Sequence, residues 1–182
     1  MDACGSHAFV CKKASGRFAR HSAINDIVTR AVAAGDYSVV KEPAGLISDS
    51  IKRPGGATLL PWRNGDYLAW DVTVATTLAA SSIEASSTLS GSASEVAASK
   101  KVAKYSDLPS HYAFQPVALE NLGTASVSTV AFIDQLGRLA SRVSGNRNER
   151  VFLWQRLSVC LQRFNSVLLA QSFIPNPPEF DE

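Results

Sequence analysis

Residues 52–74, KRPGGATLLPWRNGDYLAWDVTV, decide the fold. The stretch reads as two apolar strands, at about residues 57–62 and 67–75, which are joined at Asn64-Gly65. Asn-Gly is the residue pair that best accepts positive φ at both central positions of a tight turn, so the sequence predicts a β-hairpin. Two features need an explanation: a carboxylate, Asp71, lies within an apolar strand, and a Pro-Gly-Gly sequence stands where the first strand begins.

The alternation of side chains along the second strand predicts where Asp71 points. Successive side chains on a strand point to opposite faces, so the large apolar residues Leu68, Trp70 and Val72 share the core face. We therefore expect Asp71 on the opposite, semi-polar face. An ordinary surface or hydrogen-bonded aspartate and a functional acid are both consistent with this placement.

The rest of the chain predicts helices and further strands around the hairpin. Apolar spacing and breaker residues predict these elements: a helix of about 14 residues within 19–35, a strand at 37–43, a helix from about Ser92 to Leu108, a strand at 112–120, and helices at 126–145 and 148–173. The resulting order, α-β-β-β-α-β-α-α, predicts an α/β fold with a small mixed β-sheet flanked by helices.

Composition is that of one globular domain, with 46% hydrophobic and 19% charged residues among 182. No apolar run approaches the roughly 20 residues that a membrane helix needs, and no apolar signal segment follows Met1. Three cysteines, an odd number, favour a reducing compartment over a disulfide framework. We expect a basic segment at 1–20, one domain at 21–173 and an acidic, Pro-rich tail at 174–182.

The net charge of +2 conceals local basic clusters. Residues 138–163 hold six arginines and one acid, Glu149. Such clusters suit a polyanion partner, although solvated helix faces explain them equally well. The candidate nucleic-acid contacts are Arg20, Lys52, Arg53, Arg63, Arg156 and Arg163.

Lys101, Lys104 and Tyr105 supply a possible chemical context for Asp71. On a helix these three residues can line one side, although a basic helix face is often simply solvated. Glu42 is a further carboxylate that a sheet can bring near Asp71. Paired carboxylates hold a hard cation such as Mg²⁺ or Mn²⁺, and a lysine stabilises the charge that develops on a phosphate. This combination indicates phosphodiester hydrolysis.

The segments KRPGG, LAWDVTV and KKVAKY, in that order, resemble the restriction-like endonuclease domain of site-specific non-LTR retrotransposon proteins. That domain belongs to the PD-(D/E)XK nuclease superfamily. The segment GRFARHSAIND is similar to the Arg-His segment that precedes the domain, and the resemblance covers roughly residues 4–170. It implies a restriction-endonuclease-like fold, Mg²⁺-dependent cleavage of DNA, DNA or RNA as partner, a nuclear location, and a reverse transcriptase domain in intact relatives.

Residue roles follow from the same resemblance. Asp71 corresponds to the second metal-binding acid. Thr73 stands where simpler members of the superfamily place the lysine, so Lys101, or else Lys104, replaces it from the next helix. The implied catalytic residues are Asp71, Lys101, Lys104 and Tyr105, and the implied metal ligands are Asp71, Glu42 and the backbone carbonyl of Val72.

One position departs from the family pattern. Where the family has Pro-Asp, this chain has Pro54-Gly55, and glycine offers no ligand. Sites of this kind depend on very few carboxylates, and neither Glu42 nor Asp49 occupies the motif position, so we expect poor or absent cleavage on an intact fold. Two alternatives are a non-catalytic nucleic-acid-binding module and a protein that binds an acidic protein through Arg138, Arg142, Arg156 and Arg163.

The N-terminal segment carries candidate zinc ligands. Zinc favours four nitrogen or sulfur ligands, and Cys4, His7, Cys11 and His21 can supply them, although their spacing matches no standard finger. The resemblance implies a knuckle whose earlier cysteines would lie upstream of Met1. A frayed segment with free thiols is the alternative.

Overall fold

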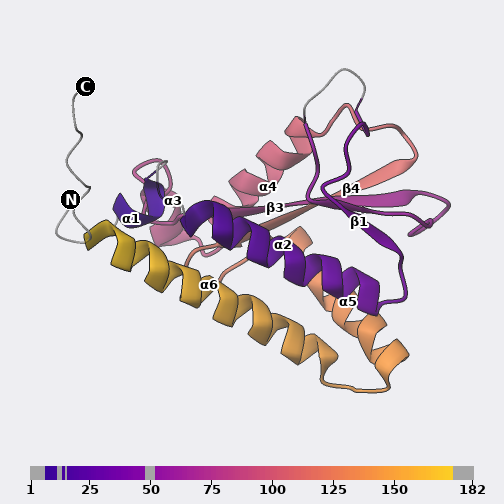
Figure 1. Ribbon diagram of the computed structural model, residues 1–182. Helices are drawn as coiled ribbons and strands as arrows, with labels where there is room; N and C mark the ends of the chain where they lie inside the picture. Colours follow the sequence, from indigo (N-terminus) through magenta and orange to yellow (C-terminus); the bar gives the residue numbers. More distant parts are fainter. Residues whose placement is uncertain (1–6, 12–13, 15, 48–51, 174–182) are drawn as a thin grey trace, which may run out of the picture.

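The computed structural model describes residues 7–11, 14, 16–47 and 52–173 (Figure 1). The helices in these residues are α1 (His7–Val10), α2 (Gly16–Ala34), α3 (Ile83–Thr88), α4 (Ser92–Lys104), α5 (Val127–Ser144) and α6 (Glu149–Phe173). The strands are β1 (Val39–Lys41), β2 (Gly56–Thr58), β3 (Tyr67–Ala75) and β4 (Tyr112–Glu120). The predicted α/β class is confirmed. No described helix is long and apolar enough to span a membrane.

The four strands form one mixed sheet in the order β1-β2-β3-β4. β2 pairs antiparallel with both β1 and β3, whereas β3 and β4 are parallel. The parallel pair is in register from Tyr67↔Tyr112 to Ala75↔Glu120. A parallel pair needs a crossover, and α3 and α4 lie in that connection.

The turn between β2 and β3 has the backbone that Asn-Gly predicts. Asn64 and Gly65 have φ values of 52° and 88°, which is the left-handed geometry of a type I′ turn. The first strand is shorter than predicted, because β2 ends at Thr58. The chain then turns Trp62 inward, where its ring packs 4.5 Å from that of Tyr37.

Helices cover both faces of the sheet. Figure 1 shows α2, α5 and α6 on one side and α4 on the other. The first side contains the main core, as the alternation in β3 predicts. Its fully buried members include Ile24, Val28, Trp70, Val72, Val117, Ile133, Leu136, Leu157 and Leu161.

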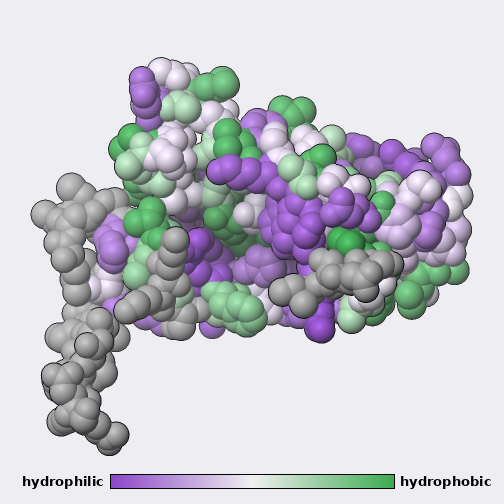
Figure 2. All heavy atoms as spheres, turned by 90° about the horizontal axis from the view of Figure 1, so that it is seen from above, coloured by the Kyte–Doolittle hydropathy of each residue, from purple (hydrophilic) through white to green (hydrophobic). Residues whose placement is uncertain are grey.

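The α4 side corrects the sequence analysis. Asp71 is predicted to lie on a semi-polar face, yet it is 3% exposed, and Ala69 on the same face of β3 is 0% exposed. The reason is that α4 packs on β3 and β4 and excludes water from this face. Hydrophilic side chains gather on the outer surface above the C-terminal end of α4, as the space-filling view from this side shows (Figure 2).

Several helix limits also differ from the predicted ones. α4 ends at Lys104 rather than Leu108, and α1 and α3 are short helices that were not predicted. α2 begins at Gly16 and continues through residue 20, where the domain boundary was expected. The predicted tail at 174–182 lies outside the described residues.

The close approach of β2 and β3 yields a stability prediction. A Cβ atom added at Gly56 would overlap the indole ring of Trp70, which is fully buried. We expect Gly56→Ala to lower the free energy of unfolding by about 3 kcal/mol, because a packed core cannot absorb the extra carbon. Urea unfolding followed by circular dichroism measures the change.

Gly45→Ala is the matched control for that experiment. Gly45 has a φ of 76° but open space around it, so only backbone strain of about 1 kcal/mol is expected. Equal losses in the two variants would contradict the packing argument.

Candidate active site around Asp71

Asp71 lies where two paired strands separate. β2 pairs antiparallel with β3 at Gly56↔Trp70 and Ala57↔Ala69, so Asp71 is the first residue of β3 that extends past Gly56, where β2 begins. On its other side Asp71 faces Pro116 of β4. β3 therefore holds the carboxylate beside a gap in the sheet, where side chains from other elements can reach it.

Lys101 and Tyr105 both reach one oxygen of this carboxylate. The Lys101 ammonium donates to Asp71 Oδ2 at 2.5 Å, and the Tyr105 hydroxyl lies 2.8 Å from the same oxygen. The two residues are one turn apart at the end of α4, which aims both side chains at β3. The structure thus brings together the strand acid and the helix lysine that the sequence analysis proposed as partners.

The Tyr105 hydroxyl also ties down the segment before β2. It lies 2.6 Å from the carbonyl oxygen of Arg53, and its single proton serves either that oxygen or Asp71. Lys104 takes a lesser part. Its ammonium donates to the Tyr105 hydroxyl at 2.9 Å, lies 3.7 Å from Asp71 Oδ2, and stays 43% exposed.

His21 of α2 occupies the other side of the carboxylate. Its Nε2 atom lies 3.0 Å from the Val72 carbonyl oxygen and 3.7 Å from Asp71 Oδ1. The sequence suggests only a zinc-ligand role for His21 and does not predict its place beside Asp71. The backbone oxygen of Val72, which was an expected metal ligand, is engaged by the ring.

These neighbours determine the protonation states at the site. Burial acts to raise the pKa of Asp71, but the nearby His21 ring and the charge and hydrogen bond of Lys101 outweigh it, so the pKa lies below its ordinary value. Burial, and then the negative charge of Asp71, raise the pKa of Tyr105. At neutral pH the pair is a carboxylate and a phenol donor.

Gly55 is enclosed by a buried amide. Asn25 of α2 is 0% exposed, donates to the Gly55 carbonyl at 2.7 Å and accepts from Trp70 Nε1 at 3.0 Å. A Cβ atom at Gly55 would lie 2.6 Å from Asn25 Oδ1. The space at the motif position is therefore filled by an amide that the two hydrogen bonds hold in place.

Glu42 does not join the carboxylate of Asp71. It is exposed at the end of β1, and β2 lies between β1 and β3. Its amide donates to the Gly55 carbonyl at 3.1 Å, and its φ is 49°. Asp49, the other acid considered, lies outside the described residues.

The donors present do not suit a magnesium ion. Among the described residues, no group of three or more His, Cys, Asp or Glu side chains could hold a metal. Asp71 is the single carboxylate of the cluster, and Lys101 already engages its Oδ2. The zinc hypothesis stays a prediction because Cys4 lies outside the described residues, and His21 lies against β3 instead.

The predicted nucleic-acid contacts fall into two groups. Arg20 is buried, donates to Asn165 Oδ1 at 3.3 Å, and has its pKa lowered by burial to about 10. It is therefore part of the interior, and its assignment as a surface contact is wrong. Among the others, Lys52 pairs with Asp107 at 3.1 Å. The exposed members are Arg53, Arg63, Arg156 and Arg163.

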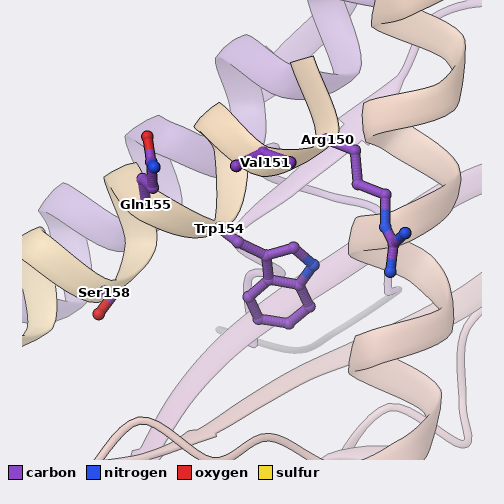
Figure 3. A pocket seen from close by; sticks show the side chains of 5 residues that line it. All are labelled: Arg150, Val151, Trp154, Gln155 and Ser158. Atoms are coloured by element: carbon purple, nitrogen blue, oxygen red, sulfur yellow. The ribbon is translucent and has the colours of Figure 1, made fainter. Parts of the chain in front are cut away.

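A separate open cleft of about 420 Å³ lies on α6 (Figure 3). Arg150, Val151, Trp154, Gln155 and Ser158 line it. Its Trp154 indole donates to Asp134 Oδ1 of α5 at 2.8 Å. None of the side chains around Asp71 lines this cleft, so it is not part of the candidate site.

No protein-family model matches the chain, and no curated protein does. Functional arguments therefore rest on the motif resemblance and on the geometry around Asp71.

The two lysines of the site are expected to differ in their effect on stability. Lys101→Met leaves Asp71 buried without its main counter-charge, so we expect a loss of about 3 kcal/mol in the free energy of unfolding. Lys104→Met, the control, removes a longer and more exposed ion pair and should cost less than about 1 kcal/mol. Urea titration measures both, and equal losses would contradict the assigned roles.

The lowered pKa of Asp71 also predicts the acid limb of stability. Its contribution is fully present above the unfolded pKa of about 3.9 and is lost as pH falls through the lower folded value. Asp71→Asn should therefore flatten the fall in unfolding free energy below about pH 4. Asp36→Asn, at an exposed acid, is the control, and an unchanged acid limb in Asp71→Asn would refute the prediction.

Proposed function

We propose that this chain is a restriction-endonuclease-like domain of the retrotransposon type whose metal centre is damaged. The observation that supports it best is the meeting of Asp71 on β3 with Lys101 and Tyr105 on α4. These residues come from the segments that resemble the family, and they are the residues to which the resemblance gives catalytic roles. In intact relatives the implied chemistry is Mg²⁺- or Mn²⁺-dependent cleavage of a DNA phosphodiester.

Lys101 would serve this chemistry through its charge. Its side chain is 18% exposed, against 5% for Asp71, so the ammonium is the member of the pair nearer to solvent. A phosphate approaching from outside would meet the lysine before the carboxylate. A positive charge in a largely dehydrated site stabilises the charge that develops on the phosphate oxygens.

The state of residue 55 makes cleavage by this copy weak or absent. Gly55 supplies no ligand, and the buried Asn25 amide fills the space that a side chain there would need. Two of the expected metal-ligand oxygens already have partners. Lys101 donates to Asp71 Oδ2, and the His21 ring lies 3.0 Å from the Val72 carbonyl oxygen.

A non-catalytic nucleic-acid-binding module is the second candidate function. It keeps the same fold and is favoured by exposed arginines, among them Arg53 and Arg63. It also needs no metal, and the side chains in the described part of the chain form no group that could hold one. Binding that weakens steeply with salt, without metal-dependent nicking, would distinguish it from the nuclease.

A plasmid-nicking assay tests the proposal. Supercoiled DNA is incubated with Mg²⁺ or Mn²⁺ and four proteins: the unchanged chain, Gly55→Asp, Gly55→Asp with Asn25→Ser, and that double variant with Asp71→Ala. The second substitution is needed because the Asn25 amide blocks a Cβ atom at residue 55. We expect little nicking by the unchanged chain, the highest nicking by the double variant, and its loss when Asp71 is removed.

Thermal melting of all four proteins controls for misfolding. If the folded double variant is inert with both metals while DNA binding persists, the non-catalytic module is the better description. If the unchanged chain nicks as fast as the double variant, Gly55 is not a defect. The first outcome decides between the nuclease and the non-catalytic module. The second decides whether Gly55 impairs cleavage.

A further inference from the structure

Three arginines converge on a cleft between the hairpin turn and α5. Arg63 follows β2 in the hairpin, and Arg138 and Arg142 stand one turn apart on α5. Together with Tyr37, Trp62 and Gln135 they line a cleft of about 280 Å³. We call it the arginine cleft. Both segments lie at the same end of the molecule in Figure 1, at the right.

The protein balances the positive charge of this cleft only in part, because Asp134 is the acid whose charge acts on Arg138. Within the described residues, none of the three arginines forms a salt bridge. Asp134 lies one turn before Arg138, but Arg150 holds its carboxylate at 2.8 Å. Like charges one helical turn apart repel each other. An anion in the cleft would remove this cost.

The floor of the cleft favours phosphate groups over bases. The Trp62 ring is 9% exposed and packs between Tyr37, at 4.5 Å, and Phe132, at 6.2 Å. It is therefore not free to stack on a base. The volume is below the roughly 300–1,000 Å³ of a typical small-molecule pocket, and guanidinium forks match phosphate oxygens.

The arginine cleft continues toward the Asp71 site. A second cleft of about 250 Å³ shares Trp62, Arg63 and Gln135 with it and extends to Phe114 of β4. The Phe114 ring lies 4.7 Å from that of Tyr105, whose hydroxyl reaches Asp71. Asp66 is the acid that lines this second cleft. The two clefts thus reach β4, the edge strand of the sheet, and the side of the sheet that carries Asp71 and Lys101 lies beyond that edge.

We propose that the arginine cleft binds the backbone phosphates of a DNA strand that extends toward Asp71. The inference rests on the proposed function, because it names how that site would hold its partner. Arg138 and Arg142, which were candidates for contacting an acidic protein, become phosphate contacts. Recognition is independent of sequence, since guanidinium groups contact phosphates and the Trp62 ring is packed between Tyr37 and Phe132.

Salt-dependent binding of a short fluorescent DNA duplex tests the inference. The variant Arg138→Gln with Arg142→Gln is compared with Arg30→Gln with Arg147→Gln, which removes the same charge from exposed positions outside the cleft. Each lost phosphate contact lowers the slope of log affinity against log salt by about 0.9. We expect the cleft variant to lose nearly two units of slope and at least about tenfold in affinity, and the control to stay close to the unchanged chain.

The outcomes separate the cleft from the proposed function. If the unchanged chain binds DNA and the cleft variant binds equally well, the inference fails while the proposed function stands. If the unchanged chain shows no salt-dependent DNA binding, both fail. A competitor arm with poly-glutamate completes the test: if it displaces DNA as effectively as unlabelled duplex, an acidic protein is the better occupant and the inference is overturned.

Discussion

The buried carboxylate of Asp71 is the constraint on which the rest of this fold depends. Removing a carboxylate from water costs several kcal/mol unless charges and hydrogen bonds replace the solvent. Here three side chains replace the solvent: Lys101 of α4, Tyr105 directly after α4, and His21 of α2. Tyr105 also lies within hydrogen-bond distance of the carbonyl of Arg53, ahead of β2. One negative charge thereby determines how a helix on each face and the entry to the hairpin sit against β3.

The same arrangement limits the chemistry. A buried carboxylate whose oxygens accept hydrogen bonds from the protein has fewer free oxygens for a cation. Here Lys101 and Tyr105 share Asp71 Oδ2. A second carboxylate at residue 55 would change this balance, because it would add negative charge next to the fork between β2 and β3. Asn25 instead fills the space with a neutral amide that satisfies the Gly55 carbonyl and the Trp70 indole. Stability and metal affinity are therefore opposed at this position.

The features that were predictable from the sequence are local ones. The Asn64-Gly65 pair predicts the turn because its backbone preference is intrinsic, and alternation predicts the core face of β3 because it needs only the strand itself. The missed features join distant segments. Asn25 meets Trp70, 45 residues away, and nothing in the pattern of α2 reveals that partner. Arg20 was misplaced for the same reason: a charged residue on a helix indicates solvent unless its buried partner, Asn165, is known.

Under the proposed function, binding and cleavage would depend on different parts of this molecule. A ligand at residue 55 would lie where β2 and β3 separate, next to the hydrogen-bonded unit of Asn25 and Trp70. The arginine cleft is built from the hairpin turn and α5 and shares none of these side chains. Because the arginine cleft shares no lining residue with the hydrogen-bonded unit of Asn25 and Trp70, we expect a substitution at residue 55 to leave the basic surface intact. Under the proposed function, a chain with glycine at residue 55 would therefore hold a polyanion without cutting it.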